Sequence, residues 1–216
     1  GIGPEAVERL LFYLLFVFPG LSMLYLMRSV DGRERPVAGT VAALFYMMNP
    51  LTLLVKWNAM PISLLAYGAM PLLLGLYVTS LRTRSLFKYP FLFGLASLVA
   101  VSATTITYLV IAVAPVIAYF LFQLVINFSR PRVVLPLVLA TMSVGLCYLV
   151  FNLWWILPSL SILGTRADII LQGDATTNLN VFKLESQDMS LLNILRAQGY
   201  WGFFKGQGGK PYYPFA

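Results

Sequence analysis

Histidine is absent from the chain, cysteine occurs once, and charged residues are scarce. Without histidine, the 216 residues hold no serine–histidine triad, no histidine base and no histidine metal site. The single cysteine, Cys147, provides neither a disulfide framework nor a thiolate metal site. We therefore expect neither a bound metal nor a cofactor.

The shortage of charge also decides the class of protein. Charged residues make up 11% of the chain and hydrophobic residues 59%, whereas soluble domains carry about 25% charged residues. Disorder, a coiled coil and a nucleic-acid-binding arm are all excluded by this apolar content. The pI of about 9.6 comes from scattered basic residues, so we expect no nucleic acid and membrane lipids as the main partners. The composition predicts an all-α, polytopic transmembrane helical bundle.

Six apolar stretches form the predicted transmembrane domain, residues 1–158, and residues 159–216 form an extracytoplasmic loop or the start of an outer domain. Asn49-Pro50 is expected to end or kink the second span, because proline disfavours a helical residue before it. The long apolar block from 91 to 128 exceeds one crossing, so we divide it near Ser102. The predicted spans are 10–27, 37–55, 61–81, 91–102, 108–128 and 133–158.

The charges between the spans predict an orientation. If the spans alternate, the turns at 28–36, 82–90 and 129–132 share one side, where eight Lys or Arg residues meet two acidic residues. The positive-inside rule places these three arginine-rich turns in the cytoplasm. The protein is then a multi-pass protein of the cell membrane whose residues 159–216 lie outside.

No Asp, Glu, Lys or Arg falls within a predicted span. Coupled transporters usually carry ionisable residues at mid-membrane, so this pattern disfavours transport and places any chemistry at the outer face. Candidate substrate-binding residues gather there: aromatic rings to stack on sugars, Lys56 to meet a lipid phosphate, and polar groups nearby, Asn152 among them. An aromatic belt with a snorkelling lysine explains the same residues without a ligand. The candidates are Asn49, Lys56, Trp57, Asn58, Trp154, Trp155, Arg166 and Asp168.

Four short motifs resemble segments of the polytopic GT-C class of glycosyltransferases, especially its arabinofuranosyltransferase-like and YfhO-like membrane proteins. They are the stretch from Ala43 to Leu53, the helix end from Asn152 to Pro158, Gly199-Tyr200-Trp201-Gly202, and Pro211-Tyr212-Tyr213-Pro214. The resemblance implies transfer of a sugar from a polyprenyl-phosphate-linked donor to a glycan acceptor on the extracytoplasmic face.

In that class the essential carboxylate lies in the first outer loop, and no acidic motif here matches it. We therefore carry over no catalytic residue, and expect the chain to be a fragment that begins downstream of this loop. The leading hypothesis is a membrane glycosyltransferase. A transporter or flippase-like protein and a non-catalytic structural membrane subunit remain as alternatives.

Overall fold

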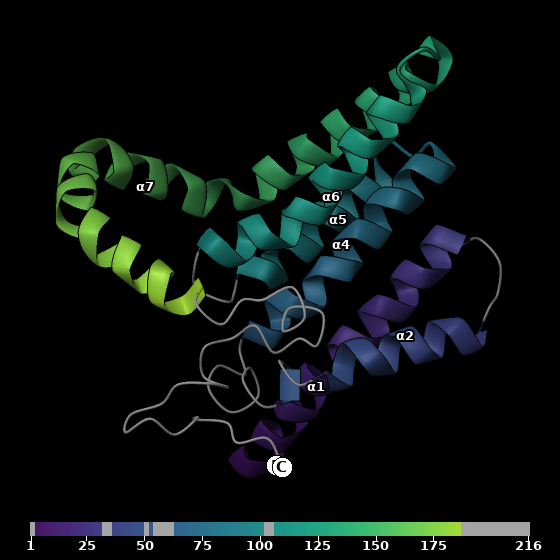
Figure 1. Ribbon diagram of the computed structural model, residues 1–216. Coiled ribbons are helices and arrows are strands. Elements are labelled where there is room, and N and C mark those ends of the chain that lie inside the picture. The colour runs from purple at the N-terminus through teal and green to yellow at the C-terminus, as the bar shows by residue number, and fades with distance from the viewer. Residues whose placement is uncertain (1–2, 32–35, 50–51, 54–62, 102–105, 187–216) are drawn as a thin grey trace. The chain divides into compact units, whose positions relative to one another are not determined.

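The computed structural model describes residues 3–31, 36–49, 52–53, 63–101 and 106–186, with the backbone alone at residues 4, 101, 106–112 and 162–186 (Figure 1). Within these ranges the chain forms six helices and no strand, which confirms the all-α prediction for this part of the protein. The helices are α1 (Pro4–Asp31), α2 (Pro36–Met48), α4 (Ser63–Thr83), α5 (Lys88–Val101), α6 (Ile106–Asn127) and α7 (Pro131–Ser186).

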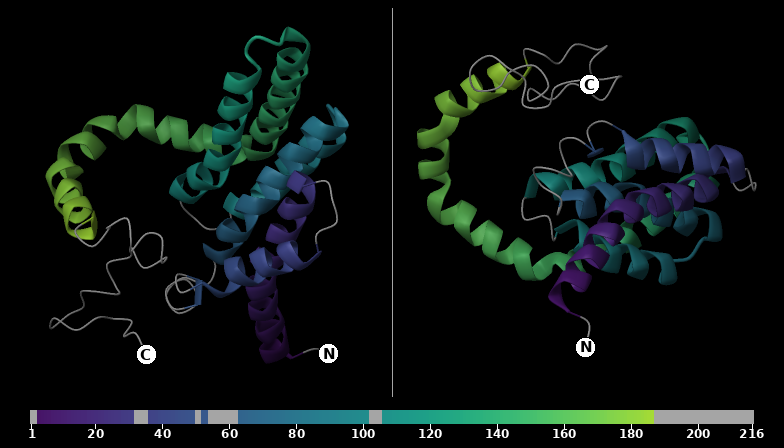
Figure 2. Two further views of the ribbon diagram at one scale, coloured as in Figure 1. Left: turned by 45° about the vertical axis from the view of Figure 1, so that its right-hand side comes forward. Right: turned by 90° about the horizontal axis from the view of Figure 1, so that it is seen from below.

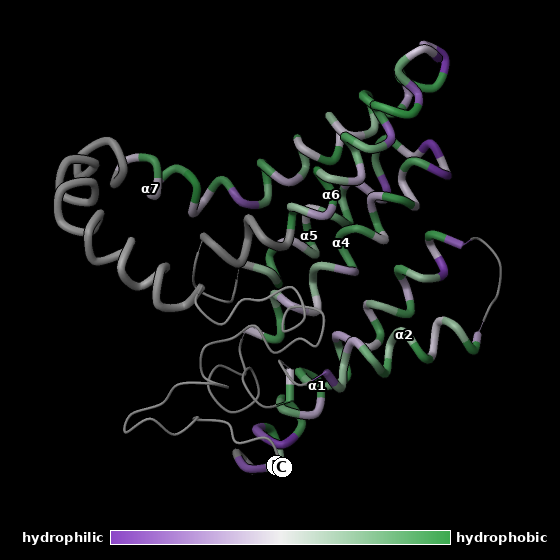
Figure 3. Tube along the Cα trace, in the orientation of Figure 1, coloured by the Kyte–Doolittle hydropathy of each residue, from purple (hydrophilic) through white to green (hydrophobic). Residues whose placement is uncertain are grey.

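Three of the described helices are long and apolar enough to cross a bilayer: Glu5–Asp31, Ser63–Thr83 and Pro131–Ser161. Shorter apolar stretches occur at Pro36–Met48, Lys88–Ala100 and Val113–Asn127. Along these helices the most hydrophilic residues lie mainly near the ends (Figure 3). Length and composition are thus compatible with a membrane protein.

Two helix ends bear on the predicted spans. Helix α2 ends at Met48, just before Asn49-Pro50, as expected from the clash between proline and a helical residue before it. Helix α7 instead continues past Pro158 to Ser186, beyond the end of the last predicted span. The first part of the segment after Pro158, as far as Ser186, is therefore helical.

The chain divides into two compact units. The first unit comprises residues 1–47 and 60–153, and the second comprises 48–59 and 154–216. Because α7 belongs to both, its residues 131–153 are described with the first unit. There, α6 and this part of α7 run antiparallel beside each other around a short turn at residues 128–130 (Figure 2).

Helix α4 is the centre of the first unit, since α1, α5 and α6 all pack against it. Of its apolar window 61% is buried, against 22% for α1 and 17% for α7. Two glycines let α1 approach closely: a Cβ on Gly68 would lie 2.4 Å from Cδ1 of Phe18, and one on Gly75 would lie 2.8 Å from Cδ1 of Tyr25. These two contacts advance together along both helices, so α1 and α4 are parallel.

Helices α5 and α7 form a second close, parallel pair. A Cβ on Gly94 would lie 2.9 Å from the backbone oxygen of Cys147. One turn further along, the Nδ2 group of Asn152 donates a hydrogen bond of 2.7 Å to Oγ of Ser97, and both side chains are fully buried. Small residues that permit close approach and polar side chains that bond across the contact are typical of helix pairs in membranes.

Candidate functional site

The eight predicted substrate-binding residues all have numbers within the second unit. Lys56, Trp57 and Asn58 lie outside the described residues. Arg166 and Asp168 lie on the described backbone of α7. Described side chains among the eight are therefore those of Asn49, Trp154 and Trp155.

Asn49 forms a polar turn directly after α2. Its side-chain Oδ1 accepts a hydrogen bond from the backbone N–H of Thr52 at 3.1 Å, and its backbone oxygen accepts one from Leu53 N–H, also at 3.1 Å. The Asn49 side chain is buried, at 7% exposure. Asparagine commonly bonds to the backbone in this way at turns, so the structure gives Asn49 a part in shaping the turn.

The two tryptophans differ in exposure. Trp154 is 66% exposed, whereas Trp155 is half-buried. An exposed indole has the flat apolar face needed to stack on a sugar ring or to lie at a membrane–water interface. The exposed face of Trp154 is therefore available both for stacking on a sugar ring and for lying at a membrane–water interface.

Asn152 occupies a different environment from the one expected at an outer binding shelf. Its Nδ2 group donates to Oγ of Ser97 and to the backbone oxygen of Tyr148, at 2.7 and 2.8 Å. Ser97 in turn donates to the backbone oxygen of Gly94 at 2.6 Å. The side chain of Asn152 is thus directed into the contact between α5 and α7.

At one end of the first unit, helices α1, α4 and α6 end and helices α5 and α7 begin. The Arg82 guanidinium donates a hydrogen bond to the backbone oxygen of Val30, which joins the ends of α4 and α1. A cavity of about 330 Å³ connects the ends of α4 and α6 with the start of α7, and Arg84 and Arg132 contribute to its lining. We call this the arginine-rich end; its described basic residues are Arg28, Arg82, Arg84, Lys88, Arg130 and Arg132.

This cavity is what the sequence interpretation missed. The sequence predicts a topological role for these arginines and is compatible with their binding anionic lipid, but nothing in it indicates that residues near 84, 123 and 132 surround one space. A partial signal does exist: Arg84 and Arg132 both stand at a helix boundary, and each has an aliphatic residue within the next two positions, Leu86 and Val133.

Among the described side chains, no group of three or more His, Cys, Asp or Glu residues is placed to hold a metal ion. In comparisons with models of protein families, with curated proteins and with solved structures, the chain matches none.

Proposed function

We propose that the chain is a multi-pass membrane protein with six alternating spans, and that it acts as a GT-C-type glycosyltransferase on the extracytoplasmic face. Membrane insertion is supported by the apolar surface that the described helices expose. Val37 and Val125 are each 75% exposed, and Phe45 is 72% exposed. Soluble proteins seldom expose apolar surface on this scale, whereas lipid-facing helices do so throughout.

The proposed orientation has the arginine-rich end in the cytoplasm and the Lys56 region and residues 159–216 outside. Its support is the positive-inside rule together with the helix directions. With alternating spans, the first and third must be parallel, as must the fourth and sixth. The contacts of α1 with α4 and of α5 with α7 have these directions.

The observation that carries the functional proposal is the separation of polar from apolar residues. Between their ends, the described apolar helices hold no Asp, Glu, Lys or Arg from 10 to 27, from 63 to 81 or from 133 to 161. The candidate substrate-binding residues instead follow α2 or occupy α7 from Trp154 onward. This pattern favours chemistry at the outer membrane face over a coupled carrier, which would need ionisable groups at mid-membrane.

In the proposed reaction, Lys56 binds the phosphate of a polyprenyl-phosphate-linked sugar and Trp154 stacks on the sugar ring. An ammonium group pairs with a phosphate as a compact point charge. An indole face offers a large apolar surface with little conformational freedom to lose. These residues position the donor, and we assign none of them a catalytic role.

The test is sugar transfer by the full-length protein in detergent, with a panel of radiolabelled polyprenyl-phosphate sugars as donors. We expect transfer from at least one donor, and a rise in KM of about 10- to 150-fold for Lys56→Gln, because a charge-assisted hydrogen bond contributes about 1.5–3 kcal/mol. Lys88→Gln, at the opposite end of the spans, is the matched control and leaves KM unchanged. Absence of transfer with every donor would favour the structural-subunit hypothesis.

A further inference from the structure

The cavity at the arginine-rich end combines positive charge with an apolar wall. Among the described residues, twelve line the cavity; eight of them are aliphatic or proline, and the four polar ones are Arg84, Gln123, Asn127 and Arg132. None of these lining residues is acidic. Its volume of about 330 Å³ is near the lower limit of small-ligand sites, roughly 300–1,000 Å³.

Three of the polar residues of the cavity, Arg84, Gln123 and Arg132, offer hydrogen-bond donors to a ligand. Within the described part of the chain, no side-chain hydrogen bond or ion pair engages the Arg84 or Arg132 guanidinium. Gln123 accepts a hydrogen bond at Oε1 from Asn127 at 3.2 Å, so the amide nitrogen of Gln123 is the group left to donate. Two guanidinium groups and an amide donor suit a phosphate, which offers only acceptors.

Arg84 occupies a backbone position where glycine is the preferred residue. Its φ of 53° is left-handed, and it follows the last residue of α4 in a Schellman motif. Arg84 N–H donates to the Leu81 oxygen at 3.4 Å, and Ser85 N–H donates to the Ser80 oxygen at 3.2 Å. A side chain in this conformation costs about 1 kcal/mol relative to glycine. A residue other than glycine at such a position points to a use for its side chain.

Two serines hold the turn that carries Arg84. The Ser80 hydroxyl donates to the Ser85 oxygen at 2.9 Å, and the Ser143 hydroxyl of α7 donates to the Leu86 oxygen. The turn is therefore fixed both to its own helix and to α7, whose first residues line the cavity. A site held in place before its ligand arrives loses less freedom on binding.

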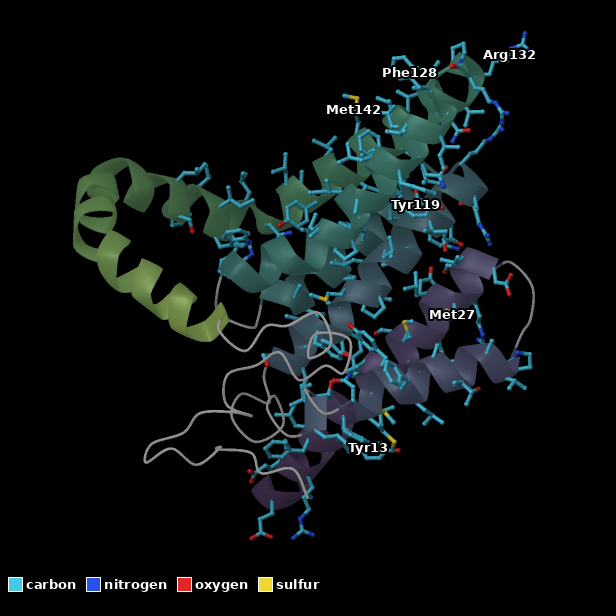
Figure 4. All side chains as sticks on the ribbon, viewed as in Figure 1. Tyr13, Met27, Tyr119, Phe128, Arg132 and Met142 are labelled. Carbon is cyan, nitrogen blue, oxygen red and sulfur yellow. The ribbon has the colours of Figure 1, made fainter. Side chains whose placement is uncertain are left out.

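The apolar wall continues out of the cavity along α7. Leu135 and Leu139 line the cavity and are 62% and 45% exposed. Met142 and Leu146 follow on the same face, because positions four, seven and eleven residues further along a helix align, and they are 67% and 64% exposed. Figure 4 shows Arg132 at the arginine-rich end and Met142 further along the same helix.

We propose that this cavity binds the phosphate headgroup of an anionic phospholipid of the cytoplasmic leaflet. Arg84, Arg132 and the Gln123 amide donate to the phosphate, and an acyl chain lies along Leu135, Leu139 and Met142. Basic pockets between helices at the cytoplasmic surface are suited to such headgroups. The inference rests on the proposed membrane insertion and orientation, but not on glycosyl transfer.

The test uses the full chain purified in an uncharged detergent and native mass spectrometry with added lipid. Wild-type protein binds phosphatidylglycerol more tightly than phosphatidylcholine. The double variant Arg84→Gln/Arg132→Gln weakens phosphatidylglycerol binding about 30-fold, on the basis of about 1 kcal/mol for each arginine. Arg130→Gln is the matched control, because Arg130 is close in sequence and equally charged but does not line the cavity. The affinity of this variant for phosphatidylglycerol stays within about twofold of the wild-type value, a smaller change than the loss of one arginine in the cavity would cause.

Two further measurements distinguish binding of a lipid from binding of free phosphate, and loss of a contact from misfolding. Inorganic phosphate alone does not displace the lipid, because it cannot use the apolar wall. Arg84→Gly weakens lipid binding while stabilising the lipid-free protein against unfolding, since glycine relieves the left-handed backbone. Equal loss in Arg130→Gln, equal binding of phosphatidylcholine, or displacement by phosphate would each overturn the proposal. These readouts require no activity, so failure of the glycosyltransferase proposal does not affect them.

Discussion

Tyr46 of α2 and Tyr67 of α4 each donate a hydrogen bond of 2.9 Å to the other's backbone oxygen. Their rings stack with centroids 4.2 Å apart and planes 5° from parallel. Each hydroxyl thus has its hydrogen-bond acceptor on the backbone of the other helix. This reciprocal pair joins the end of α2 to the central helix of the first unit.

The pair predicts different behaviour for two kinds of substitution. Tyr46→Phe and Tyr67→Phe each remove the hydrogen bond to the other residue's backbone oxygen and cost about 1 kcal/mol of unfolding free energy. Tyr46→Phe also removes the weaker contact of its hydroxyl with Sδ of Met70. Because the rings remain stacked, the two costs add. Leucine at both positions also removes the ring contact, so the double variant shows a coupling energy of about 0.5–1.5 kcal/mol. Unfolding in mixed detergent micelles measures both. If the stability losses of the two leucine substitutions simply added, the ring stacking would contribute nothing.

Gly94 and Gly145 provide a matched pair for testing the contact between α5 and α7. A Cβ on Gly94 would lie 2.6 Å from Cδ2 of Phe151 and 2.9 Å from the Cys147 backbone oxygen, which cannot move aside. Gly94→Ala is therefore expected to destabilise the protein by about 1–3 kcal/mol. Nothing lies within 4 Å of a Cβ on Gly145, so Gly145→Ala stabilises by up to about 1 kcal/mol through helix propensity. Unfolding in mixed detergent micelles measures both changes in stability. Equal changes for Gly94→Ala and Gly145→Ala would contradict the close packing at Gly94.

The hydrogen bond between Asn152 and Ser97 is expected to stabilise the same contact. Ser97→Ala removes the acceptor of the Asn152 amide and costs about 0.6–2 kcal/mol, the range found for bonds between membrane helices. Because Asn152→Leu removes the same bond, the double variant loses less than the sum of the two. Thr83→Ala, at an exposed site where the hydroxyl bonds only within its own helix, is the control. Strict additivity would mean that the two side chains do not interact.

The proposed orientation is tested by labelling of single cysteines in intact cells, on a background in which Cys147 is replaced by alanine. An impermeant maleimide is expected to react at positions 56 and 168 and not at 33, 84 or 132. After the membrane is opened, the last three react. Labelling of positions 33, 84 and 132 in intact cells would reverse the orientation and remove the basis for an outer-face site.

The all-helical fold was predictable because apolar stretches of this length leave the chain no other structure in a bilayer. The Asn49-Pro50 pair also predicted an end or a kink of the second span at Asn49, and α2 ends at Met48. Pro158 did not end α7, because a proline inside a helix bends it or removes a bond without necessarily ending it. Local sequence thus predicted where most helices lie, while the path beyond Pro158 depends on its surroundings.

The environment of single polar residues was harder to predict. Asn152 was expected beside the tryptophans at the outer face, yet it bonds to Ser97, 55 residues earlier in the chain. Which helix a polar side chain meets depends on how the helices are rotated and paired. The cavity at Arg84 and Arg132 was missed for the same reason, because it brings residues 81–86 beside the distant turn between α6 and α7.

The spacing of contacts between α1 and α4 has a mechanical consequence. Phe18 and Tyr25 are seven residues apart, and so are Gly68 and Gly75, the two glycines against which they lie. Sliding α1 by a single turn would move both rings off their glycines and onto residues that have side chains. A slide of seven residues, about 10 Å along the axis, would bring only one of the two rings back onto a glycine. The two contacts therefore oppose sliding of α1 along α4, and we expect the two helices to move as one unit.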